Sequence, residues 1–329
     1  MKYSTSLVHN ITKTMIQRYC SGVLDTNAFI VGENKDFDLH IQGLFPTASL
    51  LNHSCSANTA FSTTNDFVFA CRALTHISKG EELTTNYLHP QYHFFGRSYR
   101  HAQLNKMWNF MCRCQRCEDS TDLGTMTDGV LCRICRSGTL NIGADSEWSC
   151  NNCKVRLPYE VISSSLAQWW GIIDAVPRHD IEELMKVLGE AEKVFHHNHY
   201  HILEIKRRII ETIEETYGND YEHLDNIWLE KKVQFCQDHL TVQRLVSPGL
   251  SKYRAYLSFQ IAEPWYWLSR KRFLAQKCSK TELLETMEYI ADHLDTVIKI
   301  WGKDREESME RLQADFAADL LKMVNKMFT

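Results

Sequence analysis

Several features are scarce or missing in this 329-residue sequence, and each absence excludes a class of protein. Glycine and proline number only 14 and 6, which argues against a collagen-like, linker-rich or disordered chain. No run of 18 apolar residues occurs, so the sequence predicts no membrane span. Lysine and arginine form no cluster of five and the net charge is −4, which argues against a surface for nucleic acid or anionic lipid. Because the first residues lack the apolar core of a signal peptide, we expect a cytoplasmic or nuclear protein.

Cysteine, by contrast, is abundant, with 12 residues. Eight of them stand at close spacings or near such a group, and these are Cys55, Cys112, Cys114, Cys117, Cys132, Cys135, Cys150 and Cys153. In a small secreted domain such density would indicate disulfides. In a large chain without a signal peptide, the same clustering at ligand spacing indicates zinc.

The last four of these cysteines form a pattern of their own. Two Cys-x-x-Cys pairs, Cys132/Cys135 and Cys150/Cys153, are separated by 14 residues, close to the spacing of a zinc ribbon. Four thiolates leave no open coordination position, so we expect a structural zinc rather than a catalytic one. Trp148 is expected to cover the small core, and a redox dithiol is the alternative interpretation. The segment has too few apolar residues to fold without metal.

The first part of the chain has the pattern of one helix followed by short strands. Apolar residues in 7–19 recur at helical spacing. After Gly22 the apolar residues fall in short runs, at 23–24, 29–31 and 67–69, between glycine- and proline-containing loops. This alternation predicts a small β-rich fold.

From Pro158 onward the apolar residues recur every three or four positions, as in amphipathic helices. Three such stripes run from Ile202 to Tyr217, from Leu283 to Trp301 and from Met309 to Met323, and we expect all three to face a core. Six or seven helices in succession predict an antiparallel array similar to tetratricopeptide hairpins, although no clean 34-residue repeat is present. The whole chain is therefore predicted to be α+β.

Four histidines, His196, His197, His199 and His201, stand at the start of one predicted helix. Only some of them can share one face of that helix, which argues against a metal site. We therefore expect a local, solvated histidine cluster, with metal binding as the alternative.

Three motifs carry the chemistry, and each has an ordinary explanation when taken alone. Ser-Leu-Leu-Asn-His-Ser-Cys-Ser-Ala-Asn at 49–58 suits a turn, and Lys-Gly-Glu-Glu-Leu-Thr-Thr-Asn-Tyr at 79–87 suits a turn into a strand. Cys-Arg-Cys-Gln-Arg-Cys at 112–117 is part of a zinc site that needs a fourth ligand.

In this order and spacing, the three motifs resemble the SET domain of protein-lysine methyltransferases, and more closely its SMYD type with arthropod relatives. The segment 26–29, Thr-Asn-Ala-Phe, also resembles the SMYD core. The resemblance covers residues 1–120 by motif. The helical remainder of the chain is similar to the family in its pattern of apolar residues and in the passage 199–203.

The resemblance implies S-adenosylmethionine as the cofactor. Ser49, Asn52 and the backbone around His53 would hold the cofactor, and Phe110 would lie against its adenine. Tyr87 would stand where the methyl-bearing sulfonium meets the substrate amine, as the catalytic residue. Methyl transfer depends mainly on positioning of donor and acceptor, and a tyrosine hydroxyl contributes to this without ionising. The alternatives are that His53 is a loop histidine bonded to backbone and that the aromatics are ordinary core residues.

The resemblance also implies a substrate channel and a first zinc site. Phe29, Tyr87 and Trp108 would line a narrow lysine channel, whose apolar walls favour the neutral amine. Trp108 stands where the family has a second channel tyrosine, and it offers no hydroxyl oxygen. Cys55 would join three later thiols on one zinc, namely those of Cys112, Cys114 and Cys117.

Two segments of the family pattern are not found in this sequence. No Gly-x-Gly precedes Asn27, and there is no cysteine-rich MYND module upstream of the motifs. We expect a partial SET insert, core and post-SET segment over 1–120, a zinc ribbon over 128–157 and a helical domain over 158–329.

The predicted function is a SMYD-like protein-lysine N-methyltransferase that acts on a histone or another protein and carries two structural zinc ions. The alternative is a catalytically inactive, SET-derived scaffold that binds a protein partner through its helical domain. We expect no direct contact with nucleic acid.

Overall fold

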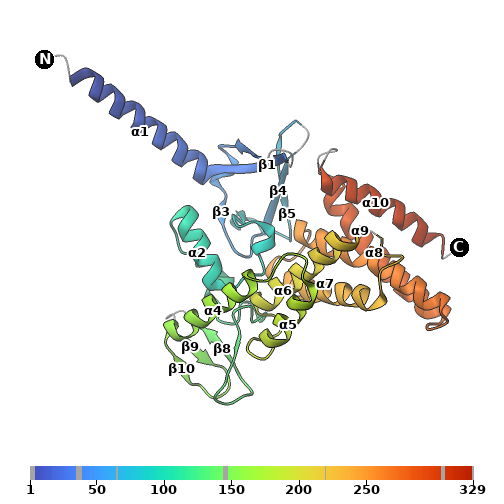
Figure 1. Ribbon diagram of the computed structural model, residues 1–329. Coiled ribbons are helices and arrows are strands. Elements are labelled where there is room, and N and C mark those ends of the chain that lie inside the picture. The colour runs from blue at the N-terminus through green and yellow to red at the C-terminus, as the bar shows by residue number, and fades with distance from the viewer. Residues whose placement is uncertain are drawn as a thin grey trace.

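The computed structural model describes residues 4–34, 39–63, 66–143, 147–218, 220–304 and 308–327. Figure 1 shows one long helix that projects from a region of short strands, a small separate sheet, and a large group of helices. Among the described residues, no helix is both long and apolar enough to span a membrane.

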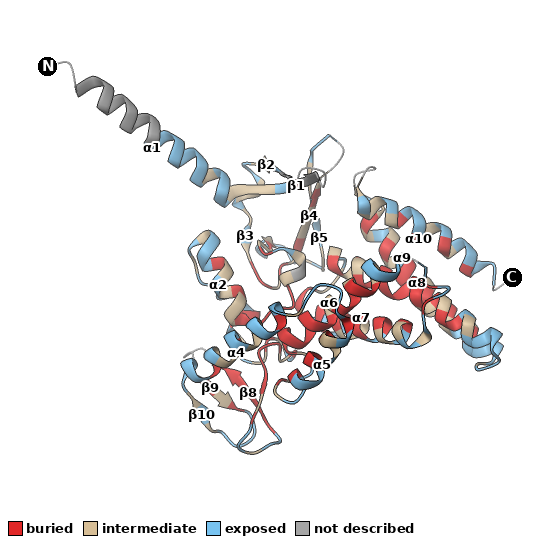
Figure 2. Ribbon diagram, in the orientation of Figure 1, coloured by how far each residue is buried: buried red, intermediate tan, exposed pale blue. Residues whose placement is uncertain are grey.

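The projecting helix is α1 (Ser4–Asn27), and it is longer than the helix predicted over 7–19. The short extended run expected at 23–24 is therefore wrong, because both residues lie in the last turns of α1. The side chains of Met15, Ile16 and Tyr19 are exposed. Figure 2 shows that the described part of α1 has almost no buried side chain.

The strands that follow form three small pairs rather than one continuous sheet. They are β1 (Ala28–Asn34), β2 (Leu39–Leu44), β3 (Asn52–His53), β4 (Thr59–Thr63), β5 (Phe69–Ala73) and β6 (Thr84–Thr85), with short 3-10 helices at Ala48–Leu50 and Pro90–Tyr92. β1 pairs with β2 and β4 pairs with β5, both antiparallel, whereas β3 and β6 are parallel. The strand expected over 67–69 begins at Phe69, because Phe67 adopts a turn conformation with a φ of +56°.

The zinc-ribbon segment forms a four-stranded antiparallel sheet in the order β10-β9-β8-β7. Its strands are β7 (Val130–Leu131), β8 (Thr139–Ile142), β9 (Trp148–Cys150) and β10 (Arg156–Leu157). Trp148 is fully buried, as expected for a residue that covers the small core. A Cβ on Gly138 would stand 2.5 Å from the Cys150 sulfur, so the turn before β8 requires glycine.

The helices build most of the core. They are α2 (Arg97–Trp108), α3 (Gln115–Glu118), α4 (Tyr159–Asp174), α5 (Ile181–Ala191), α6 (Tyr200–Tyr217), α7 (Asn226–Val246), α8 (Lys252–Leu274), α9 (Lys280–Trp301) and α10 (Met309–Asn325). Seven of these helices follow Pro158, so the predicted helical C-terminal region is confirmed. Ile202, Ile205 and Ile209 of α6 are fully buried, and Gly218 ends this helix with a φ of +59°. Trp148 and Leu140 of the ribbon belong to the same hydrophobic cluster as α4–α7.

Most of the apolar stripe on α10 does not face the core, contrary to prediction. Met309, Leu312, Phe316 and Met323 are all more than two-fifths exposed. Leu320 is the one buried member of the stripe, and the helix packs through it together with Ala314, Ala317 and Val324. Small alanine side chains let α10 approach its neighbours closely, and this turns the longer apolar side chains outward.

The expectation of a solvated histidine cluster is wrong for His199 and His201, whereas His197 is exposed and His196 is partly exposed. His199 and His201 are fully buried at the start of α6, where the His199 ring stacks on Phe195 at 4.1 Å. A nitrogen of the His201 ring lies 3.1 Å from the Leu166 carbonyl oxygen. Burial lowers the pKa of His201 to about 3, so the ring is neutral and belongs to the core.

Buried histidines of this kind predict a loss of stability in mild acid. Burial lowers the pKa of His239 from 6.5 to about 4. Its Nε2 donates to the Leu203 carbonyl oxygen at 2.8 Å, and its Nδ1 accepts from the Tyr253 hydroxyl at 3.3 Å. Between pH 6.5 and pH 4 the unfolded chain takes up a proton that the folded chain excludes, so stability falls as the pH falls. At pH 5 this one residue accounts for about 2 kcal/mol.

The measurement is urea unfolding at pH 7 and pH 5. We expect His239→Gln to reduce the difference between the two pH values, because glutamine can donate to Leu203 without titrating. His197→Gln, at an exposed position, should leave the difference unchanged. An undiminished difference in His239→Gln would contradict the assignment.

Candidate functional site

Parallel pairing of β3 with β6 brings the first two sequence motifs together. Asn52 pairs with Thr84 and His53 with Thr85. The backbone N–H of Ser54 donates to the Thr85 carbonyl oxygen at 3.0 Å, which continues the pairing by one residue. The loop 79–87 is thereby held against the loop 49–58.

Asn58, the last residue of the first motif, holds the two loops together through its side chain. Its side-chain oxygen accepts from the Thr84 N–H at 2.9 Å, and its amide nitrogen donates to the Glu82 carbonyl oxygen at 2.8 Å. Asn58 was not predicted as a site residue, although its place at the end of the motif at 49–58 was a signal for it.

His53 connects the tyrosine of the second motif to a cysteine of the first. Its Nδ1 accepts from the Tyr87 backbone N–H at 3.0 Å, and its Nε2 lies 3.3 Å from the Cys55 sulfur. Burial lowers the pKa of His53 to about 4. The ring is therefore neutral, and with Nδ1 acting as an acceptor its proton is on Nε2, facing the sulfur.

Tyr87 lies at the centre of an aromatic group. Its hydroxyl donates to the Leu51 carbonyl oxygen at 2.6 Å. Its ring centroid lies 5.2 Å from both His53 and Trp108, and 6.4 Å from Phe110. Burial raises the pKa of the half-buried Tyr87, so the hydroxyl stays protonated at neutral pH.

Trp108, the last residue of α2, and Phe110, two residues later, also belong to this aromatic group. The indole N–H of Trp108 donates to the Thr26 carbonyl oxygen at 3.1 Å, which also ties this segment to the end of α1. Phe110 packs edge-on against His53 at 5.8 Å. The structure thus brings together four of the predicted site residues: His53, Tyr87, Trp108 and Phe110.

Three other predicted site residues make their contacts elsewhere. The exposed Asn52 donates to the Glu82 carboxylate at 2.7 Å, and Ser49 donates to the carbonyl oxygens of Asn27 and Phe45. Phe29 packs in an aromatic cluster at the strand pairs, with its centroid 4.9 to 6.2 Å from three other rings, those of Phe45, Phe61 and Phe69. Within the described residues, Phe29 makes no ring contact with Tyr87.

The first group of thiols gathers from two distant segments. The sulfurs of one group all lie within 4.8 Å of one another, and they belong to Cys55, Cys112, Cys114 and Cys117. Cys55 and Cys117 are 62 residues apart in sequence, with their sulfurs 3.5 Å apart. Hydrogen bonds from Cys112 and Cys114 lower the pKa of Cys117, whereas contacts with the neighbouring thiols raise the pKa of Cys55 and Cys112, so the protons are shared unevenly within the group.

The second group consists of the ribbon cysteines. The sulfurs of Cys132 and Cys153 are 3.8 Å apart, and so are those of Cys135 and Cys150. Zinc bound tetrahedrally at about 2.3 Å from each sulfur requires sulfurs about 3.8 Å apart. Both groups therefore fit zinc by donor type and spacing. Among the described residues, these two are the only groups of this kind.

Comparisons with known proteins agree with this geometry. Residues 6–88 match the SET domain family. The Drosophila melanogaster SET domain-containing protein SmydA-8, isoform A, is 31% identical over 144 residues, which is 42% of this chain and 30% of that protein. The mouse protein-lysine N-methyltransferase SMYD4 is 31% identical over 132 residues, covering 37% of this chain and 16% of SMYD4.

The chain contains a SET domain, and over the matched part it is similar to proteins of the SMYD type. Histone-lysine N-methyltransferase SET5 of Meyerozyma guilliermondii is a further relative, 44% identical over 82 residues, or 23% of this chain and 16% of SET5. The matched part spans less than a third of the length of each of these relatives.

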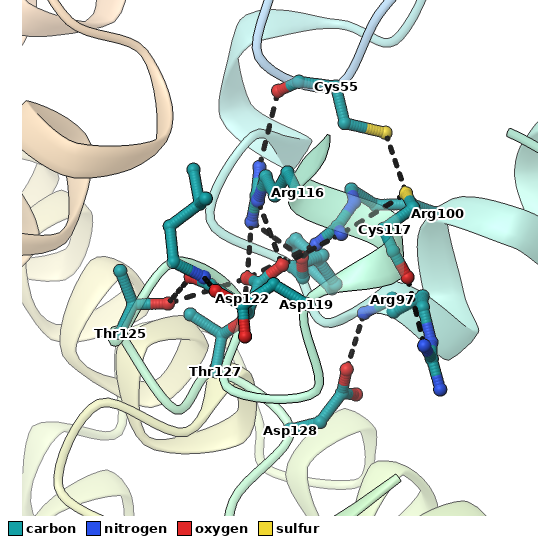
Figure 3. Close-up of polar contacts among 12 residues, drawn as sticks. Cys55, Arg97, Arg100, Arg116, Cys117, Asp119, Asp122, Thr125, Thr127 and Asp128 are labelled. Atoms are coloured by element: carbon teal, nitrogen blue, oxygen red, sulfur yellow. Dashed lines mark hydrogen bonds and ion pairs between the residues drawn. The ribbon is translucent and has the colours of Figure 1, made fainter. Parts of the chain in front are cut away.

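A buried cluster of charged residues supports the first thiol group of the SET protein (Figure 3). Arg100 and Arg116 are fully buried, and both pair with Asp122, at 2.8 and 2.7 Å. Arg100 also lies 3.5 Å from the Cys117 sulfur, and Arg116 lies 3.5 Å from the Cys55 carbonyl oxygen. We call Arg97, Arg100, Arg116, Asp122 and Asp128 the arginine–aspartate cluster. This cluster could not be predicted from the sequence, because buried and exposed arginines look alike there.

Proposed function

We propose that this chain acts in protein-lysine N-methylation, with S-adenosylmethionine as methyl donor and a lysine side chain of a protein as acceptor. The observation that carries the proposal is the grouping of Tyr87, His53, Trp108 and Phe110 beside a four-thiol site, within a SET protein. The names of SMYD4 and SET5 as lysine methyltransferases support it. The same proposal includes two zinc ions and a cytoplasmic or nuclear location. It also includes a division of the chain into a SET region over 1–120, a zinc ribbon over 128–157 and a helical domain over 158–329.

The residues present fit this cofactor and reaction. S-adenosylmethionine supplies a methyl group on a positively charged sulfur. The oxygens of Tyr87 and Leu51 are acceptors that suit such a polarised methyl group and a substrate amine. The partly exposed ring of Phe110 offers an apolar face for the adenine.

The role of Tyr87 is to position the two reacting groups. Its hydroxyl is neutral and points to the Leu51 carbonyl oxygen, and its backbone is held by His53. Its oxygen lone pairs can align the substrate amine while the N–H of His53 stays on the side of Cys55. Trp108 narrows the space beside the ring and excludes water, which favours the deprotonated lysine that attacks.

The first experiment is calorimetric titration of S-adenosylmethionine into the zinc-loaded full chain. We expect saturable binding at one site, followed by transfer of labelled methyl to lysine in a screen of histone and other protein substrates. Failure to bind at millimolar concentrations, by a folded chain that contains about two zinc ions, would contradict the proposal. That outcome would favour the SET-derived scaffold that binds a protein partner.

Tyr87→Phe tests the assigned role directly. Loss of the hydroxyl should lower methyl transfer by about 100-fold, by analogy with removal of one preorganised polar group in an active site. Cofactor binding should be retained, because the ring and its contacts remain. The readouts are the transfer rate with labelled cofactor and the calorimetric affinity.

Tyr159→Phe is the matched control, since Tyr159 is exposed at the start of α4. It should transfer methyl at the native rate. Unchanged transfer in Tyr87→Phe would remove Tyr87 from the mechanism.

A further inference from the structure

Arg97, the first residue of α2, contacts a ligand of the first thiol site and the sheet of the ribbon. Its Nη1 donates to the Cys117 carbonyl oxygen at 2.9 Å. Its Nη2 donates to the carbonyl oxygens of Ile142 and Gly143 at 2.9 and 2.6 Å. One buried side chain thus joins the backbone of a ligand in the first site to the end of β8 in the ribbon.

The ribbon end of this connection lies on the strand that pairs with β9, the strand that carries one of the second set of thiols. Ile142 pairs with Trp148, and Leu140 of the same strand pairs with Cys150. Loss of metal from the ribbon removes the cross-link between the β7–β8 turn, which carries Cys132 and Cys135, and the end of β9, which carries Cys150. The position of the Ile142 and Gly143 carbonyl groups therefore depends on the metal at the second site.

The cluster leaves Arg97 little freedom to adjust. Its backbone N–H donates to the Asp128 carboxylate at 2.5 Å. A Cβ on the preceding Gly96 would stand 1.9 Å from the same carboxylate, so this contact is close. Arg100, one turn further along α2, is held by Asp122 (Figure 3). The start of α2 is therefore fixed. The Arg97 guanidinium can donate all its hydrogen bonds only if the carbonyl groups of Cys117, Ile142 and Gly143 stay where they are.

Because Arg97 is charged and buried, loss of any of its hydrogen bonds to these carbonyl oxygens lowers the stability of the folded chain. Within the described residues, no carboxylate forms an ion pair with its guanidinium, and the three carbonyl oxygens are its hydrogen-bond acceptors. A buried charged donor that loses an acceptor is destabilised more than a neutral one. Arg97 therefore holds the Cys117 carbonyl group best when the ribbon is intact.

We propose that the two thiol sites of this chain bind metal cooperatively and that Arg97 is the positioning residue that couples them. Metal in the ribbon fixes β8, β8 fixes the Arg97 guanidinium, and the guanidinium orients the segment that carries Cys117. By reciprocity, metal at the first site also strengthens binding at the ribbon. The proposal rests on metal binding at both sites and is independent of methyl transfer.

The test measures the affinity of the first site for Co²⁺ with and without a working ribbon. Cys153→Ser disables the ribbon at its exposed ligand, so the buried part of the ribbon is disturbed least. Charge-transfer absorption of thiolate-bound Co²⁺, titrated against a chelator, reports the affinity of the remaining site. In the native background we expect Cys153→Ser to weaken the first site by about tenfold, a typical size for coupling between sites.

The same comparison in an Arg97→Met background completes the cycle. There the ribbon mutation should change the affinity of the first site by less than about twofold, because the connection is already broken. Arg97→Lys serves as a second variant, since it keeps the charge but lacks the two-armed guanidinium, and it should show reduced coupling. Arg156→Met, at an exposed position on β10, is the control and should keep the full effect.

Far-ultraviolet circular dichroism checks that each variant retains the helices α4–α10. An affinity of the first site that does not respond to Cys153→Ser in the native background overturns the proposed cooperativity. A full tenfold response in the folded Arg97→Met background overturns the role of Arg97.

Discussion

Cys55→Ser should remove one zinc ion from the chain and destabilise the SET region strongly. Cys55 is the only ligand of the first site that comes from the Asn-His-Ser-Cys loop, and the other three come from 112–117. Metal at this site therefore ties two segments that lie far apart in sequence. Structural zinc in small domains contributes about 10–16 kcal/mol of apparent binding free energy, and much of it is folding free energy.

The effect should extend to the aromatic group. The Cys55 sulfur stands 3.3 Å from His53, and His53 holds the backbone of Tyr87. Phe110 precedes Cys112 by two residues and depends on the same site for its position. We therefore expect S-adenosylmethionine binding to be lost together with the zinc ion.

Zinc content per chain and urea unfolding monitored by tryptophan fluorescence are the measurements. We expect zinc to fall from about two ions to one and the unfolding free energy to fall by at least about 3 kcal/mol. Cys71→Ser, at an exposed cysteine on β5, is the matched control and should change neither value. A Cys55→Ser protein with native zinc content would show that the first thiol group is no metal site.

Asp122→Asn should have the second large effect. Asp122 is the shared partner of Arg100 and Arg116, both of which are fully buried. It also accepts hydrogen bonds from the Thr125 and Thr127 hydroxyls. Asparagine preserves the shape of the side chain but leaves two buried guanidinium groups without their anion. Removal of one partner from a buried ion pair costs about 3–5 kcal/mol.

The charge state of Asp122 sets the pH range of this contribution. Burial acts to raise the pKa of Asp122, but the charges of Arg100 and Arg116 lower it to about 2. A carboxyl group whose pKa is lowered on folding adds stability above its unfolded pKa, and that stability is lost as the pH falls towards 2. At neutral pH the full contribution is present.

Urea unfolding at pH 7 compares Asp122→Asn with the native chain. Asp319→Asn is the control, because Asp319 forms an exposed ion pair with Lys322 on α10, and such pairs contribute little. A stability for Asp122→Asn within error of the native chain would show that the buried ion pairs add nothing.

The sequence by itself was sufficient for those features that follow from local chemistry. Cysteine pairs at ligand spacing predicted the ribbon thiol group and three thiols of the first group, because a metal restricts how far apart its ligands stand in the chain, whereas Cys55 was assigned through the family resemblance. The stripe from Leu283 to Trp301 predicted the buried face of α9, since helical periodicity places those side chains on one side. The three motifs, taken together, pointed to the SET family.

Other features depended on which surfaces meet, and local patterns do not contain that information. The stripe on α10 has the same periodicity as that on α9, yet α10 is the last described helix and packs through its alanines. His199 and His201 look like polar surface residues in the sequence, but they are packed among aromatic rings. Phe29 packs against three other phenylalanine rings of the strand pairs, and only the folded chain brings those rings next to it.

The arginine–aspartate cluster was decided by tertiary structure alone. Its members come from α2, α3 and the loop before β7, and only the folded chain brings them together. A buried arginine is stable only where anions and carbonyl oxygens surround it, and those partners are supplied by segments distant in sequence. The sequence determined which groups can bind metal, whereas the tertiary structure placed Arg97 of α2 between the Cys117 carbonyl group and the end of β8.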